Sequence, residues 1–259
     1  MLFCDADRRD AHGVQILREL LAPPICLGCG APGADLCAAC RRGLPWLADP
    51  RCARCGLPGS CRRCPAAGLA FGAAWAPVAY AGPALALVAA LKFRRVRVAA
   101  EPMVAAMARA PHWLGGEAPL LVPVPTARSR AKARGFDQAI TLASGLAARG
   151  VGDLLACLER TGRAPRQVGA DRRERLSAGR IEVRVRPGAA VSTVRAAEGP
   201  AGVSAAMRSS ASAMGAGART FVLVDDVHTT GATLDACARA LKAAGAERVV
   251  ALTYARALP

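Results

Sequence analysis

Eight of the eleven cysteines fall within residues 26–64, where they form four Cys-x-x-Cys pairs. Two thiolates at this spacing can hold one face of a metal ion, and two such pairs complete the tetrahedral shell that zinc prefers. Because four thiolates leave no open coordination position, the metal would be structural Zn²⁺. The spacing predicts a double zinc-ribbon module over residues 26–67, with these ligands: Cys26, Cys29, Cys37, Cys40, Cys52, Cys55, Cys61 and Cys64.

Sequence neighbours suggest that the first and second pairs share one metal site and the third and fourth another, although the spacing also allows an interleaved pairing. Redox-active dithiols are the alternative to zinc. Cys4, Cys157 and Cys237 stand alone and are not expected to be ligands. The module could contact nucleic-acid backbone, staple the chain or dock a partner protein, because six arginines lie between or beside its cysteines: Arg41, Arg42, Arg51, Arg54, Arg62 and Arg63.

A second group of chemically suggestive residues lies at 221–233, where an apolar run leads into two acids, a hydroxyl-rich turn and a predicted helix. A helix start offers unpaired backbone N–H groups that bind phosphate, and glycine lets the backbone approach a ligand closely. Asp225 and Asp226 can accept hydrogen bonds from vicinal hydroxyls. The pattern predicts a site for a ribose 5-phosphate unit, with the phosphate on Thr229, Thr230, Gly231, Ala232 and Thr233.

Basic residues follow a second apolar run, which ends at residue 125. Arg128, Arg130, Lys132 and Arg134 alternate with small residues before the run Gly-Phe-Asp-Gln-Ala at 135–139. Cations that alternate after the end of a strand can gather around a pyrophosphate. This run is therefore a candidate pyrophosphate site.

The segment 221–233 resembles the phosphoribosyl pyrophosphate (PRPP) motif of type I phosphoribosyltransferases. With the cysteine module, the basic run at 122–139, Leu-Lys-Phe at 91–93 and residues 167–175, the chain resembles the ComF/GntX family. In that family an N-terminal zinc ribbon precedes a phosphoribosyltransferase-like domain, and its members are associated with natural competence and DNA utilisation. The resemblance implies an α/β fold at 70–259, a type I phosphoribosyltransferase-like parallel sheet flanked by helices.

The resemblance also implies a reaction, the Mg²⁺-dependent displacement of pyrophosphate at ribose C1 by an enzyme of the glycosyltransferase class. Asp225 and Asp226 would position the sugar, and Arg128, Arg130 and Arg134 would bind the pyrophosphate. The alternative is a non-catalytic nucleic-acid-binding or adaptor protein of DNA uptake that uses PRPP as a regulatory ligand. Single-stranded DNA and proteins of the DNA-uptake machinery would then be partners.

Two positions qualify this resemblance. The family usually carries Asn where this chain has Asp137, which could change a hydrogen bond or simply cap the following helix. His228 occupies a variable position between the acids and the turn, where it could act as a catalytic group or be a bystander. The sequence contains no recognisable pocket for a nucleobase.

Alternating strands and helices must position these residues. Strands are expected near 74–80, 120–125, 153–159, 220–225 and 248–254, and helices near 83–93, 98–109, 137–149 and 233–244. Strand–helix–strand passages imply parallel pairing. Residues 1–25 are expected to be a helical or flexible segment, and 187–219 a flexible insertion in the 70–259 domain.

Charge is the remaining clue to partners. The chain of 259 residues has 35 Lys and Arg against 19 Asp and Glu, a formal net charge of +16, which favours phosphate-bearing partners. Residues 160–186 carry nine arginines against three acids. That segment could be a lid over the reaction centre, a nucleic-acid stripe centred on Arg172, Arg173 and Arg175, or a solvated charge run.

Location follows from two further patterns. The charge-free stretch at 65–91 is interrupted by glycine and proline, so a core strand and helix are expected there rather than an integral membrane span. The first ten residues mix acids with arginines, unlike a signal peptide. We therefore expect a cytoplasmic protein with reduced thiols.

Overall fold

The computed structural model describes residues 23–116, 119–161, 182–189 and 219–259. Most of the N-terminal segment 1–25, of the arginine-rich segment 160–186 and of the insertion 187–219 lies outside these ranges, so the expectations for those segments stay predictions.

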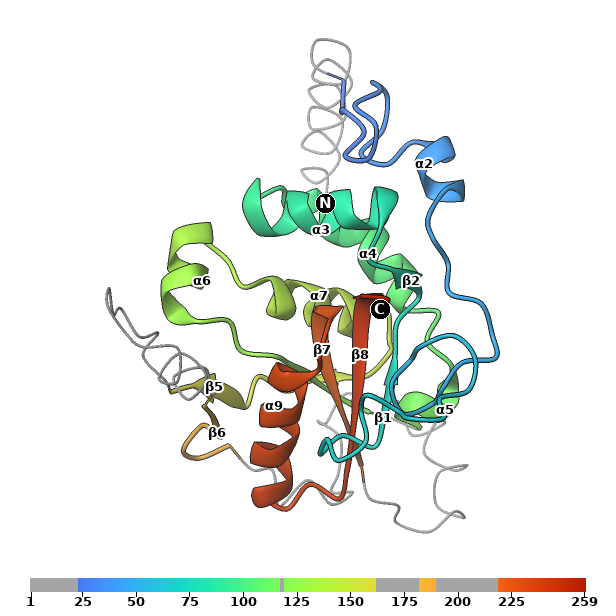
Figure 1. Ribbon diagram of the computed structural model, residues 1–259. Helices are drawn as coiled ribbons and strands as arrows, with labels where there is room; N and C mark the ends of the chain where they lie inside the picture. The colour runs from blue at the N-terminus through green and yellow to red at the C-terminus, as the bar shows by residue number, and fades with distance from the viewer. Residues whose placement is uncertain (1–22, 117–118, 162–181, 190–218) are drawn as a thin grey trace, which may run out of the picture.

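A parallel sheet of six strands forms the centre of the protein (Figure 1). Its strand order is β1-β8-β7-β3-β4, with β2 paired to β8 beyond the end of β1, and every pairing in it is parallel. A separate antiparallel pair joins β5 to β6. The bounds are β1 (Ala73–Trp75), β2 (Val78–Ala79), β3 (Leu120–Pro123), β4 (Asp153–Leu154), β5 (Leu158–Arg160), β6 (Val183–Val185), β7 (Thr220–His228) and β8 (Arg248–Arg256).

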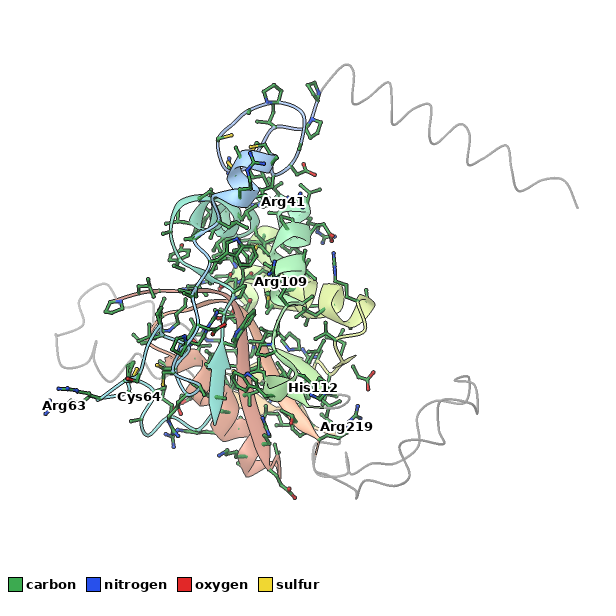
Figure 2. The ribbon with its side chains drawn as sticks, turned by 90° about the vertical axis from the view of Figure 1, so that its right-hand side faces the viewer. Arg41, Arg63, Cys64, Arg109, His112 and Arg219 are labelled. Carbon is green, nitrogen blue, oxygen red and sulfur yellow. The ribbon has the colours of Figure 1, made fainter. Side chains whose placement is uncertain are left out.

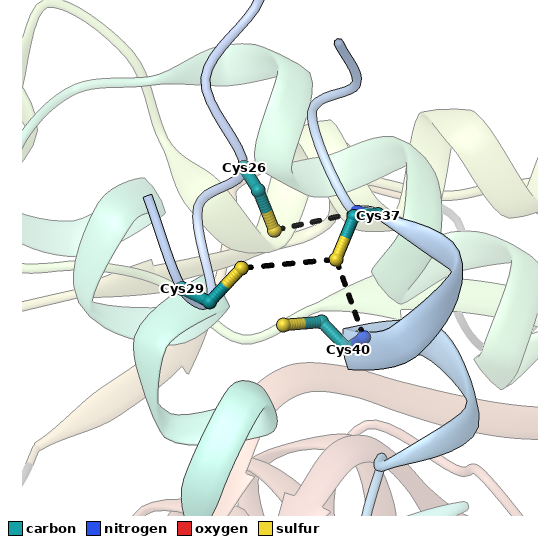
Figure 3. A group of neighbouring side chains, drawn as sticks. All are labelled: Cys26, Cys29, Cys37 and Cys40. Atoms are coloured by element: carbon teal, nitrogen blue, oxygen red, sulfur yellow. Dashed lines mark hydrogen bonds between the residues drawn. The ribbon is translucent and has the colours of Figure 1, made fainter. Parts of the chain in front are cut away.

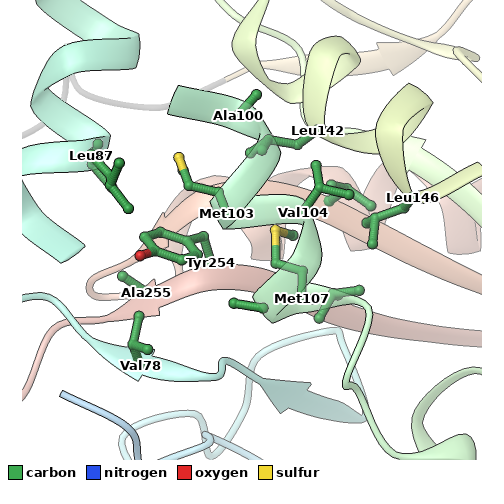
Figure 4. Packing of buried hydrophobic residues seen from close by; sticks show 14 of the residues in the cluster. Val78, Leu87, Ala100, Met103, Val104, Met107, Leu142, Leu146, Tyr254 and Ala255 are labelled. Carbon is green, nitrogen blue, oxygen red and sulfur yellow. The ribbon is translucent and has the colours of Figure 1, made fainter. Parts of the chain in front are cut away.

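Helices cover both faces of this sheet because its inner strands are apolar on both sides. In β7, Val222 and Val224 belong to the core cluster that includes α3, α4 and α7, whereas Phe221 and Leu223 belong to the cluster that includes α9. Figure 4 shows the first cluster, in which Leu87, Met103 and Leu142 lie on these three helices. This alternation follows from the two-residue period of a strand. The helix bounds are α2 (Ala38–Arg42), α3 (Gly82–Phe93), η1 (Arg97–Ala99), α4 (Ala100–Met107), α5 (His112–Gly115), α6 (Arg128–Arg134), α7 (Gln138–Ala148) and α9 (Ala232–Ala243).

The described elements differ from the sequence expectation in four places. The strand expected at 74–80 is split into β1 and β2, with Pro77, which has no N–H to donate, between them. The strand expected at 153–159 is split between two sheets as β4 and β5. The basic run at 128–134 is the helix α6, which ends at a left-handed Gly135. Finally, β7 continues past both acids to His228.

The cysteine-rich segment contributes to both cores. Cys26, Leu36 and Leu44 join the cluster on the α3 side, whereas Cys55 and Ala66 join the cluster on the α9 side. Between these two parts the chain follows the edge of the sheet, where the backbone N–H of Leu47 donates to the carbonyl of Pro77. The cysteine-rich segment therefore packs into the hydrophobic core on both faces of the central sheet. In the described part of the chain, no helix combines the length and the apolar character needed to cross a bilayer.

Candidate metal centres and phosphate site

The eight cysteines of the module form two groups of four, each made of neighbouring pairs. The first group is Cys26, Cys29, Cys37 and Cys40 (Figure 3), and the second is Cys52, Cys55, Cys61 and Cys64. Within each group all four Sγ atoms lie within 4.8 Å of one another. The sequential pairing is therefore the one that the fold adopts, and the interleaved alternative is not.

The sulfur separations fit zinc better than disulfides. The Sγ atoms are 3.7 Å apart in Cys29/Cys37, 3.9 Å in Cys52/Cys64 and 3.5 Å in Cys55/Cys61. Tetrahedral zinc with Zn–S bonds of about 2.3 Å requires sulfur atoms about 3.8 Å apart, whereas a disulfide requires about 2.05 Å. Two structural Zn²⁺ sites with four cysteine ligands each are consistent with this arrangement.

Backbone N–H groups shape the first site. Cys37 donates its N–H to the Sγ of Cys26 at 3.3 Å, and Cys40 donates to the Sγ of Cys37 at 3.4 Å. The hydrogen bond from the N–H of Cys37 is the main reason why the pKa of Cys26 falls to about 6. A side-chain hydrogen bond between Cys40 and Cys29, together with desolvation, raises the pKa of Cys40 to about 12. Adjacent thiols cannot all carry charge together, and a divalent cation would neutralise them.

The arginines of the module do not form one basic platform. Arg51 donates to the carbonyls of Leu47 and Ala76 and lies over the ring of Trp75, while Arg54 donates to the carbonyls of Ala66 and Leu69. These two therefore hold the module together. The other four arginines are exposed and form two pairs of sequence neighbours, Arg41 with Arg42 and Arg62 with Arg63. Figure 2 shows Arg41 of the first pair far from Arg63 of the second.

A cavity of about 610 Å³ lies at the carboxyl ends of β3 and β7. It brings together two segments that the sequence analysis treated separately, the basic helix α6 and the acidic end of β7. The predicted residues in its lining are Arg130, Arg134, Asp225, Asp226, Thr229 and Thr233, and the further cations are Lys92 and Arg160. Arg128, also predicted, begins α6.

The two acids point to opposite sides of β7, as successive residues of a strand do. Asp226 is almost completely buried, and its Oδ1 pairs with Nζ of Lys92 at 2.8 Å. Its Oδ2 has no hydrogen-bond partner among the described residues. Asp225 is half-buried, and burial, followed by the nearby charge of Asp226, raises its pKa well above the usual value. The cavity therefore holds one paired carboxylate and one carboxylate that favours a proton.

The predicted phosphate residues form the turn between β7 and α9, which we call the phosphate turn (residues 229–233). Together they line a smaller hollow of about 40 Å³, and Thr229 and Thr233 also line the main cavity. Gly231 has a left-handed φ of 84° just before α9. A Cβ at this position would lie 3.0 Å from both His228 Nε2 and Leu69 Cδ1. Only glycine fits the conformation and the space together.

His228 is a packing residue in this arrangement. Its side chain is buried and its ring meets the ring of Phe71 edge to face, with centroids 5.8 Å apart. Burial, with a smaller effect from the charge of Arg256, lowers the pKa of His228 to about 4. The imidazole is therefore neutral near pH 7. Because His228 is not among the residues that line the main cavity, the geometry favours the bystander alternative.

Asp137 caps the helix α7. Its Oδ1 accepts from the N–H groups of Ala139 at 2.9 Å and Ile140 at 3.3 Å. Its Oδ2 accepts from the N–H of Thr126 at 3.3 Å, which fixes the loop after β3. Of the two sequence interpretations of this position, the structure supports the cap.

Sequence reasoning missed two residues of the site. Lys92 lay in the Leu-Lys-Phe run that contributed to the family resemblance, but no role was assigned to it, although a lone lysine at the end of an apolar helix was a usable signal. Arg256 has no motif around it, and only its contacts reveal it. It is buried and donates to the carbonyls of His228 and Thr229, the second of which belongs to the phosphate turn.

With this geometry in place, the comparisons define the class of protein in part. Residues 17–70 match the family model of the double zinc ribbon domain. No curated protein matches the chain. The chain thus combines a cysteine-rich zinc-ribbon module with a mostly parallel α/β sheet, at whose carboxyl edge lies a cavity rich in basic side chains.

Proposed function

We propose that the protein binds PRPP in the cavity at the carboxyl ends of β3 and β7, as a phosphoribosyltransferase-like protein. One observation carries the proposal: four cations, two carboxylates and a hydroxyl-rich helix start line one space. The cations and the helix start favour anionic groups such as a phosphate and a pyrophosphate, while the carboxylates favour sugar hydroxyls. PRPP carries a phosphate, a pyrophosphate and hydroxyls on a single ribose.

The proposed roles follow from position. The phosphate turn binds the 5-phosphate through its backbone N–H groups and threonine hydroxyls. Asp225 accepts hydrogen bonds from the ribose hydroxyls, and Asp226, held by Lys92, sets the shape and charge of the adjoining wall. Arg130 and Arg134 of α6, which line the cavity, bind the pyrophosphate, and the family resemblance assigns Arg128 the same role.

In the proposed reaction the bond between C1 and the pyrophosphate oxygen breaks, and its electron pair leaves on the pyrophosphate while an acceptor bonds to C1. The arginines stabilise the charge that develops on the leaving group. Mg²⁺, for which carboxylate and phosphate oxygens are suitable hard ligands, would neutralise further charge when bound. A role in DNA uptake rests on the family resemblance.

Calorimetry with PRPP and Mg²⁺ tests the proposal. We expect the wild-type protein to bind, and the double variant Asp225→Asn plus Asp226→Asn to lose at least about ten-fold in affinity, about 1.4 kcal/mol. Glu101→Gln is the matched control because Glu101 is an exposed acid outside the cavity. No binding to the wild-type protein would refute the proposal.

Pyrophosphate release then separates catalysis from regulation. An enzyme releases pyrophosphate from PRPP with a suitable acceptor, and the double variant does not. If PRPP binds without release, and single-stranded DNA binds with an affinity that falls steeply with salt, PRPP is a regulatory ligand of a nucleic-acid-binding protein.

A further inference from the structure

We propose that the second cysteine group (Cys52, Cys55, Cys61 and Cys64) and the phosphate turn form one coupled unit joined by Arg256, so that zinc in this group controls how tightly the turn binds a phosphoryl group. The proposal deepens the proposed function and rests on it for the chemical class of the ligand. The coupling itself rests on the contacts described below.

Arg256 connects the two sites directly. Its Nε donates to the carbonyl of Cys55, a cysteine of the second group, at 3.0 Å. Its Nη1 donates to the carbonyls of His228 at 2.8 Å and Thr229 at 2.6 Å, and to Ala257 at 2.9 Å. A guanidinium presents these donors in one rigid plane, so displacing Cys55 displaces the backbone that leads into the phosphate turn.

A second connection runs through the chain that leaves the cysteine group. Arg54, which lies between Cys52 and Cys55, donates to the carbonyls of Ala66 and Leu69. Leu69 then lies against Gly231, where an added Cβ would meet its Cδ1 at 3.0 Å. The next residue, Ala70, donates its N–H to Oδ1 of Asp235 in the first turn of α9 at 2.6 Å. The second group thus supports the turn from its C-terminal side as well.

The charge on Arg256 favours the same coupling. The guanidinium is buried, and no carboxylate pairs with it within the part of the chain that the structure describes. Buried cations need a compensating partner. Four thiolates around Zn²⁺ carry a net charge of −2, and Cys55, one of these ligands, accepts the Nε hydrogen bond of Arg256 on its carbonyl. A metal-loaded second group therefore stabilises the cation that holds the turn.

The first cysteine group provides the internal comparison. Across the described ranges, no hydrogen bond links residues 23–42 to the phosphate turn or to any residue after 70. Its contacts with the sheet domain are apolar, such as the approach of Gly28 to Pro83 at the start of α3. Loss of zinc from this group should leave the phosphate turn unchanged.

Amide hydrogen exchange at residues 229–233 tests the coupling without any ligand. We compare the full-length double variant Cys61→Ser plus Cys64→Ser with Cys29→Ser plus Cys37→Ser, with the zinc content of each measured. Exchange at these amides should rise about ten-fold or more in the first variant and less than about two-fold in the second. Equal exchange in both variants would overturn the proposal.

Arg256→Lys provides a variant in which both zinc sites stay intact, should the cysteine variants fail to fold. Lysine keeps the charge but cannot join the two sites with a rigid fork. Ribose 5-phosphate is the ligand probe because it lacks the pyrophosphate that would chelate zinc. Coupling between binding free energies is reciprocal, so the probe should raise the zinc affinity of the second group, measured by equilibrium competition with a chelator, about five-fold or more in the wild-type protein and less than about two-fold in Arg256→Lys.

The outcomes separate the two proposals. If neither PRPP nor ribose 5-phosphate binds the wild-type protein, the proposed function is in error, while the exchange comparison still decides the coupling. If the probe binds and raises the zinc affinity equally in the wild-type protein and in Arg256→Lys, Arg256 does not carry the coupling and this inference fails.

Discussion

The two cysteine groups have the same ligands and the same knuckle spacing, yet they are joined to the protein differently. The first packs by apolar contact against the α3 side of the sheet, whereas the second packs on the α9 side and accepts a hydrogen bond from Arg256 at the end of β8. Ala70, beyond the second group, donates its N–H to Asp235 in α9. Figure 2 shows Arg41, beside the first group, far from Cys64 of the second. Two cysteine groups with the same ligand types can therefore differ in their connections: the described contacts of the first with the sheet domain are apolar, and the second is also hydrogen-bonded to Arg256 next to the phosphate turn.

Removing one ligand from each group tests this comparison with the largest expected effect. Cys55→Ser removes a fully buried ligand whose carbonyl holds Arg256. We expect loss of one zinc and a loss of unfolding free energy of about 4 kcal/mol, or about 10 °C in Tm. Cys29→Ser, at an exposed ligand, should also lose one zinc but lower Tm by less than half as much.

Zinc stoichiometry and thermal unfolding provide the measurement. The wild-type protein should contain two zinc ions per chain and each variant one. Equal losses of Tm in the two variants would show that the groups are equivalent supports, contrary to the comparison.

Lys92→Met tests whether the connection between the α3 side of the sheet and the cavity is the ion pair of Lys92 with Asp226 rather than a contact of the first cysteine group. Lys92 lies in the last turn of α3 and pairs with Asp226, whose side chain is 3% exposed. Removing the lysine leaves a buried carboxylate without its partner, which should cost about 3 kcal/mol. The matched control is Arg149→Met, because its partner Glu101 is 70% exposed and such pairs contribute less than about 1 kcal/mol.

Urea unfolding of both variants measures the difference. Zinc content should stay at the wild-type value in each, since neither residue contacts a cysteine group among the described contacts. A Lys92→Met variant as stable as Arg149→Met would mean that Asp226 finds another partner.

Gly231→Ala sharpens the comparison on the side of the second group. Alanine at this φ of 84° costs about 1 kcal/mol, and its Cβ would also press on Leu69 and His228. We expect a total loss of about 2 kcal/mol together with weaker binding of ribose 5-phosphate. Gly30→Ala, in the first group, has a φ of 79° and no atom within 4 Å of the added Cβ, so it should lose only about 1 kcal/mol.

Binding and unfolding of these two glycine variants are measured together. Unchanged ribose 5-phosphate affinity in Gly231→Ala would show that the contact with Leu69 has no influence on the phosphate turn.

The parts of the molecule that the sequence predicted are those specified by neighbouring residues. A Cys-x-x-Cys knuckle is complete within four residues, so both cysteine groups were visible from spacing. The apolar run before Asp225 and the helix after Gly231 were equally local, and both are present as β7 and α9. Local signals of this kind depend on chain geometry alone.

What the sequence could not predict depends on contacts between distant residues. Lys92 and Asp226 are brought together only when α3 packs on the sheet, and Arg256 meets Cys55 only when β8 joins the cysteine-rich segment. Both contacts depend on how segments far apart in the chain pack together, and no local sequence pattern encodes that packing. The assignment of Asp225 and Asp226 to a ligand likewise stays a prediction, although the structure gives the two acids different surroundings.

Those surroundings predict the smallest effect: replacing each acid by Asn should change the thermal stability in opposite directions. Burial and the charge of Asp226 raise the pKa of Asp225, so the folded protein holds this proton more tightly than the unfolded chain does. Ionised Asp225 therefore opposes folding at pH values above its unfolded pKa of about 3.9, and stability is lost as pH rises through its folded pKa.

Asp225→Asn should therefore raise Tm near pH 7 by a few degrees, about 2–4 °C for each kcal/mol, while weakening ligand binding. Asp226→Asn removes the partner of Lys92 and should lower Tm instead. Thermal unfolding of both variants at pH 5 and pH 8 decides the point, because the gain from Asp225→Asn should be larger at pH 8. A loss of stability in both variants would show that the acids share one structural role and that the two sides of β7 do not differ at this position.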